Sequence, residues 1–210
     1  MFYCAMRIIF WSAFWSSFVM AGFFGWRKDV FGVVTFLLGA AGLLVLFLLR
    51  KSKFISKYYE PSFGETLLGL VGIIFLLSDF GNLYFYDNWN FRWLGYDTIT
   101  HFVIPAIFVV IVAMLYELLW LKRGVPPAVE VIFVGALTVV IFSFLWELFE
   151  KQSDLWWGTR MFWDPTQPIV LDTVDDLVAD FYGVFLGSIL IFKNWDSWNK
   201  KWLKNNVNGS

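Results

Sequence analysis

The sequence is poor in charge, in cysteine and in histidine. Only 16% of its 210 residues are charged, whereas 59% are hydrophobic and 22% are aromatic. This composition lies outside the average of soluble globular proteins and is typical of membrane proteins. The single cysteine, Cys4, excludes an internal disulfide and is interpreted as a packing residue. The single histidine, His101, argues against zinc sites with three histidines and against di-iron bundles with two Glu-x-x-His motifs.

Apolar segments of about 20 residues recur along the chain, and this length crosses about 30 Å of hydrocarbon. The predicted spans are residues 6–24, 30–49, 66–86, 98–120, 127–149 and 173–192. They occupy most of the chain and leave no room for a soluble domain. Of the 13 tryptophans, all but Trp11 and Trp15 lie at or beyond the span ends, as in the aromatic belt of a membrane protein. We therefore predict an all-α, polytopic membrane helix bundle with about six transmembrane helices, and a single transmembrane bundle over residues 1–210.

The basic residues predict an orientation. With six spans, the termini and the second and fourth connections share one side of the membrane. That side holds Arg7, Arg50, Lys51, Lys53, Lys57, Lys122, Arg123, Lys193, Lys200, Lys201 and Lys204. The other side holds fewer, namely Arg27, Lys28, Arg92, Lys151 and Arg160. The positive-inside rule then places both termini in the cytoplasm of a multi-pass plasma (inner) membrane protein. Because VMAGFFGW is a poor cleavage site, we expect the first span to be retained.

In this orientation, polar side chains from four segments gather at the extracytoplasmic ends of the spans. They are Asp79, Asn82, Asp97, His101, Glu147, Glu150, Asp172, Asp175, Asp176 and Asp180. A carboxylate near a bilayer is costly, so it usually has a partner or a function.

Two pairs have helical spacing. Asp97 and His101 are four residues apart, so both can contact one ion, or the carboxylate can orient the imidazole. The alternative is a helix N-cap followed by a histidine packed below the interface. Glu147 and Glu150 share a face, and two like charges so close repel unless a cation lies between them. The alternative is a solvated helix end, which would account for Glu150 better than for Glu147.

The aspartates of the last span follow the same spacing. Asp172, Asp176 and Asp180 recur at intervals of four. An N-cap at Asp172 and a first-turn acid at Asp175 or Asp176 are ordinary features of helices. Asp180 lies about 12 Å farther along the axis than Asp172, so capping cannot account for it.

Gly183 and Gly187 have the small-x-x-x-small spacing that lets another helix approach closely. Approach of either preceding span would gather the carboxylates around His101. The predicted metal ligands are Asp97, His101, Glu147, Glu150, Asp176 and Asp180. One nitrogen with several oxygens suits a divalent Mn, Fe, Zn, Mg or Ca ion. An unmetallated network of protonated carboxyls is the alternative.

Two arginines lie in the aromatic loops beside these acids. Arg92 and Arg160 are predicted to bind the phosphate of a lipid or of a substrate. Ion pairing to the acids, with anchoring at the interface, is the alternative.

Three motifs in this order resemble the VanZ-like membrane proteins. They are Asp97-x-x-x-His101-Phe102, Glu147-x-x-Glu150 and Asp176-x-x-x-Asp180-x-x-Gly183-x-x-x-Gly187. The pieces YDTITHF, WELFE and LDTVDD resemble the related YjdF-like inner-membrane proteins more closely, over residues 96–188. In that group we would expect a further acid and a tryptophan ahead of Asp172, where this chain has TQPIVLD. The resemblance implies a role at the cell envelope and supplies no reaction.

Three functions follow as alternatives. The first is a metal-dependent protein acting on a lipid or envelope substrate, with His101, Asp97 and Asp180 as catalytic residues. The second is a structural subunit with a membrane-protein partner or a homo-oligomer. The third is a proton- or cation-coupled transporter. The clustering of the acids at one face and the lack of a detectable inverted repeat argue against it, although Glu117 is an acid at an inner helix end. Membrane lipid is the expected contact in each case, and no nucleic-acid partner is expected.

Overall fold

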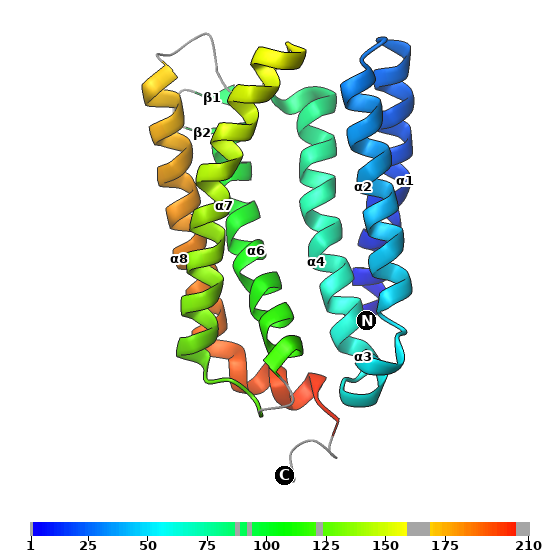
Figure 1. The fold of residues 1–210 in the computed structure, drawn as a ribbon, viewed down its shortest axis with the longest axis vertical. Coiled ribbons are helices and arrows are strands. Elements are labelled where there is room, and N and C mark those ends of the chain that lie inside the picture. The colour runs from blue at the N-terminus through cyan, green and yellow to red at the C-terminus, as the bar shows by residue number, and fades with distance from the viewer. Residues whose placement is uncertain (1, 87–88, 92–93, 121–123, 159–168, 205–210) are drawn as a thin grey trace. The chain divides into compact units, whose positions relative to one another are not determined.

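The computed structural model describes residues 2–86, 89–91, 94–120, 124–158 and 169–204, and these are almost entirely helical (Figure 1). The helices are α1 (Phe2–Trp26), α2 (Val30–Leu49), α3 (Lys53–Tyr58), α4 (Pro61–Phe80), α6 (Tyr96–Trp120), α7 (Ala128–Trp157) and α8 (Ile169–Trp202), with a π-helical turn, η1, at Gly81–Phe85. A short antiparallel pair, β1 (Asn90–Phe91) and β2 (Leu94–Gly95), precedes α6. The predicted all-α membrane class is confirmed.

Among the described residues, five helices are long and apolar enough to cross a membrane: α1, α2, α4 with its extension to Leu83, α6 and α7. They make the chain a multi-pass membrane protein. Helix α8 is not among these five, and its first part carries Asp172, Asp175, Asp176 and Asp180. The sixth span at residues 173–192 therefore stays a prediction, as does the cytoplasmic placement of both termini.

The chain divides into two compact units, each described by itself. The first comprises Met1–Phe85 and Asn194–Ser210, and the second comprises Tyr86–Lys193. In the first unit, α1 packs against both α2 and α4, around a core of Phe10, Ala13, Leu43 and Leu68. The single transmembrane bundle expected over residues 1–210 stays a prediction.

Helix boundaries agree with the sequence where a local signal marks them. Helix α2 has the predicted bounds, because the Asp29 side chain accepts a hydrogen bond of 3.0 Å from the Gly32 amide and caps its start. Helix α7 instead runs past residue 149 to Trp157, and it ends at Gly158, whose φ of 65° is left-handed. Helix α8 begins at Ile169, so Asp172 lies in its first turn and is not the N-cap.

The end of α8 also differs from the prediction. The helix continues past residue 192 to Trp202, which brings Trp195 and Trp202 into the first unit. Their exposures are 2% and 4%, so these two tryptophans are core residues and do not belong to an aromatic belt. The Trp202 ring packs edge-on against Phe63, and its carbonyl accepts a hydrogen bond of 2.6 Å from the Glu60 amide.

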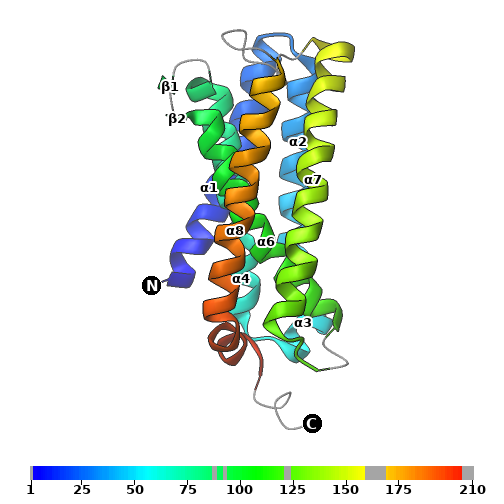
Figure 2. The same ribbon diagram turned by 90° about the vertical axis from the view of Figure 1, so that its left-hand side faces the viewer.

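In the second unit, α6 packs against α7, and α8 packs against α6 through two glycines. A Cβ added at Gly187 would lie 2.5 Å from the Ala106 carbonyl oxygen, and one at Gly183 would overlap the Phe102 carbonyl. The close approach predicted from the glycine spacing is therefore confirmed, with α6 as the partner. Within this unit the start of α6, the end of α7 and the start of α8 lie at the same end (Figures 1 and 2).

Candidate metal centre

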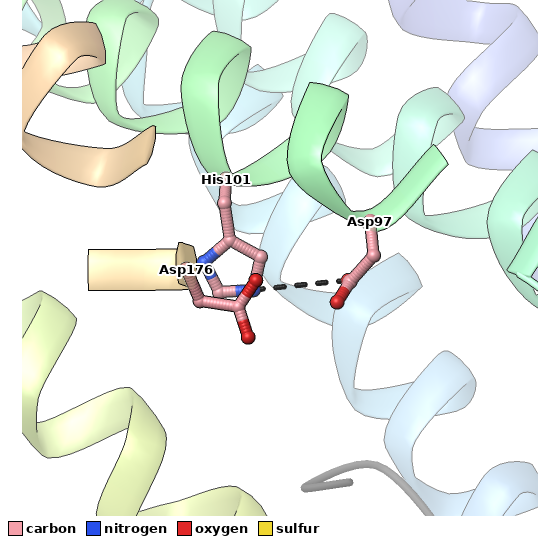
Figure 3. A group of neighbouring side chains, drawn as sticks. All are labelled: Asp97, His101 and Asp176. Carbon is pink, nitrogen blue, oxygen red and sulfur yellow. Dashed lines mark ion pairs between the residues drawn. The ribbon is translucent and has the colours of Figure 1, made fainter. Parts of the chain in front are cut away.

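His101 lies at the centre of the polar end of the second unit. Its Nδ1 is 3.1 Å from Oδ1 of Asp180 on α8. Its Nε2 is 3.8 Å from Oδ1 of Asp97, one turn earlier on α6, and Figure 3 shows this second contact. Because a carboxylate only accepts hydrogen bonds, Nδ1 is the nitrogen that donates to Asp180. The lone pair of Nε2 in the neutral ring then faces Asp97.

Within the part of the chain that the structure describes, two overlapping groups of side chains have the geometry of a cation site. The first is Asp97, His101 and Asp176, and the second is His101, Glu147 and Glu150. Within each group the ligand atoms lie within 4.8 Å of one another. Figure 3 shows the first group, with Asp97 and His101 projecting from α6 and the Asp176 carboxylate beside the imidazole. His101 is common to both groups, so one imidazole connects carboxylates from three helices.

Among the side chains of this centre, Glu147 stands out because its carboxylate lacks hydrogen bonds to the described residues. Its exposure is 6%, and neither carboxylate oxygen has a hydrogen-bond partner among the described residues. A buried carboxylate without a partner carries a desolvation penalty that only a cation, a proton or water can offset. The α7 face therefore presents to the centre an acceptor that no described residue uses.

Glu150 is also buried, so a solvated helix end is the wrong interpretation of this residue. The helix continues for two further turns and keeps Glu150 inside the unit. Sequence reasoning missed two other residues of the same face, Ser143 and Ser153, which are buried with the two glutamates. Their helical spacing was the available signal, because Ser143 precedes Glu147 by four residues and Ser153 follows Glu150 by three.

The four aspartates in the first part of α8 lie on two different faces of the helix. Asp172, Asp176 and Asp180 are buried, whereas Asp175 is exposed. Asp176 belongs to a candidate ligand group, and Asp180 contacts Nδ1 of the imidazole. This is the arrangement of a ligand histidine whose second nitrogen is held by a carboxylate.

Some residues that the sequence predicted for this cluster do not lie among the described residues around His101. Asp79 is buried in the first unit, where the Ser16 hydroxyl donates a hydrogen bond to it. Asn82, in η1, donates a hydrogen bond of 2.9 Å to the Ser78 carbonyl of the preceding α4. The predicted anion-binding residues Arg92 and Arg160 lie outside the described residues.

Comparison with known proteins adds one match. A family model described as "Predicted membrane protein (DUF2238)" matches residues 3–196. No curated protein and no solved structure matches the chain. The match covers nearly all of the chain, including the first three predicted spans.

Proposed function

The chain belongs to the family of predicted membrane proteins DUF2238, and from this premise we propose that its second unit binds a divalent metal ion at His101 for chemistry on a lipid or envelope substrate. The likeness of the three motifs to VanZ-like and YjdF-like proteins supports a role at the cell envelope. The charge distribution supports a site at the extracytoplasmic face of the plasma membrane.

The observation that carries this proposal is the Glu147 carboxylate. It is buried, it has no hydrogen-bond partner among the described residues, and its ligand atom lies within 4.8 Å of those of His101 and Glu150. The two glutamates repel each other, and burial removes water from both of them and from the imidazole. A cation between the three groups would offset both costs. The burial of Glu150 and Asp176 is consistent with the same ion.

The residues present fit such an ion. His101 would bind through Nε2, with oxygen ligands from Asp97, Asp176, Glu147 and Glu150, while Asp180 positions the imidazole through Nδ1. One nitrogen with several oxygens suits Mn, Fe, Zn, Mg or Ca. When bound, the ion would supply Lewis acidity toward a phosphoryl or carbonyl oxygen.

The exposed member of the centre is Asp97, whose side chain is 50% exposed, in contrast to the buried acids of α7 and α8. It is therefore the carboxylate that an entering substrate would meet first, and the one placed to accept a proton from it. Arg92 and Arg160, in the flanking loops of the sequence, are proposed to hold a phosphate of that substrate.

Elemental analysis tests the proposal. We expect purified protein to contain a stoichiometric divalent metal, His101→Ala to lose it, and Asp175→Asn to retain it, because Asp175 is exposed beside the buried Asp176. Each variant is checked for folding by circular dichroism. Folded wild-type protein that contains no metal and binds none of the five candidate ions would show that the acids form an unmetallated network instead.

A further inference from the structure

A second charged cluster lies in the first unit, where two arginines share one carboxylate. Arg7 Nη2 is 2.7 Å from Glu65 Oε1, and Arg7 Nε is 3.2 Å from Glu65 Oε2. Arg50 Nε is 3.5 Å from the same Oε1. Two guanidinium groups face one buried carboxylate, so the cluster keeps one positive charge in excess.

The excess positive charge of this cluster is accessible at Arg7. The Arg50 side chain is 11% exposed and stacks over the Phe47 ring at 3.6 Å, whereas the Arg7 side chain is 56% exposed. Arg7 directs Nε and Nη2 to Glu65, and its Nη1 makes no hydrogen bond to any described residue. A guanidinium fixed on one edge and open on the other is suited to a phosphate oxygen.

An open groove of about 460 Å³ follows α1 and includes this arginine near its N-terminal end. Its lining residues are Cys4, Arg7, Ile8, Trp11, Ser12 and Trp15. Trp11 and Trp15 are the two tryptophans that do not lie at a predicted span end, so the aromatic belt does not account for them. From Arg7 to Trp15 the groove extends about 12 Å along the helix axis.

We propose that this groove binds an anionic phospholipid, with its phosphate at Arg7 and an acyl chain along Ile8, Trp11 and Trp15. The lining is charged at one end and mainly apolar beyond it, which matches a lipid headgroup followed by its chain. The unbalanced positive charge favours a lipid of net negative charge over a zwitterionic lipid, which carries its own cation. Arg7 also falls on the predicted cytoplasmic side, where anionic lipids are attracted to basic residues. The metal centre of the second unit is not needed for this site.

Native mass spectrometry of the full chain in detergent tests the site. Protein titrated with equimolar phosphatidylglycerol and phosphatidylcholine should retain the former preferentially. Arg7→Gln should lower phosphatidylglycerol affinity about fivefold and remove the preference, because one arginine near a membrane surface contributes about 1 kcal/mol. Arg27→Gln is the matched control, since this exposed arginine lies beyond the far end of α1.

Ile8→Trp provides a second variant, which fills the groove without touching the ion cluster and therefore carries the test if Arg7→Gln fails to fold. It should weaken phosphatidylglycerol retention as well. Equal retention of the two lipids by wild type, or unchanged retention in a folded Arg7→Gln protein, would overturn the proposal. Competition by glycerol phosphate as strong as that of the intact lipid would also overturn it, because a headgroup alone would then account for binding.

Discussion

His101 on α6 and Asp180 on α8 are joined by a contact of 3.1 Å between Nδ1 and Oδ1, across 79 residues of sequence. The contact selects which imidazole nitrogen carries the proton and directs the other nitrogen toward Asp97. The glycines that follow Asp180 let α8 come close enough to make it. The chemistry of the centre therefore depends on helix packing as much as on the ligands.

Asp180→Asn should weaken metal binding about 10- to 100-fold without abolishing it, because Asp180 positions the imidazole and the ligands themselves remain. Nitrogen-15 NMR of the histidine is a direct measurement, since His101 is the only histidine and gives one pair of ring signals. In metal-free protein the Nδ1 and Nε2 shifts should move toward a tautomeric mixture in the variant. Unchanged shifts and unchanged affinity would show that the contact does not orient the ring.

Glu147→Gln should have opposite effects with and without metal. In chelator-treated protein the variant should be as stable as wild type or more so, because an unpartnered buried carboxylate has been removed. With metal at 100 times its Kd, wild type should gain about 2.7 kcal/mol, and the variant should lose most of that gain. Thermal unfolding with and without EDTA measures both. Equal metal stabilisation of the two proteins would exclude Glu147 as a ligand.

Asp176→Asn and Asp175→Asn form a matched pair of adjacent substitutions. Asp176 is buried in a candidate ligand group, whereas Asp175 is exposed on the same helical turn. We expect only the first to lower metal affinity, by at least about tenfold, since one charged ligand contributes more than about 1.4 kcal/mol. Titration calorimetry with Mn²⁺ would detect the difference, and equal losses from both variants would indicate a general charge effect.

Gly187→Ala should destabilise the second unit by about 1–3 kcal/mol, because the added methyl group meets the Ala106 carbonyl of α6. Metal affinity should fall with it, since α8 carries Asp176 and Asp180. Gly42→Ala is the control: nothing lies within 4 Å of a Cβ there, and alanine favours helix by about 0.5–1 kcal/mol. Unfolding in detergent mixtures measures both variants. A Gly187→Ala protein as stable as wild type would mean that α8 is not held close to α6.

Much of the fold could be predicted because the signals are local. Runs of apolar residues predict membrane helices from hydropathy alone, and the span predicted at residues 30–49 has the bounds of α2. The true extents of α7 and α8 could not be predicted in the same way. Their ends carry charged and aromatic residues that hydropathy excludes, yet Trp195 and Trp202 are buried by packing that the sequence does not display.

The candidate site could also be predicted only in part, because some of its features are local and others depend on helix packing. Because Asp97 and His101 are four residues apart, they share one face whenever this segment is helical. The glycine spacing predicts that another helix packs closely, but it does not identify that helix. Which carboxylates point inward depends on how each helix is rotated against the next. The burial of Glu150 and the exposure of Asp175 follow from that rotation.

The sequence by itself determined that this protein is a multi-pass helical membrane protein with acids from four segments and one histidine at the same ends of its predicted spans. It could do so because length, hydropathy and helical spacing are properties of each segment alone. Only the tertiary structure decided that α6 is the helix that α8 approaches and that Asp180 holds Nδ1 of His101. It also decided that Glu147 has no partner within the described chain. Those relationships join residues far apart in sequence, and they exist only when helix packing brings the side chains within a few ångströms.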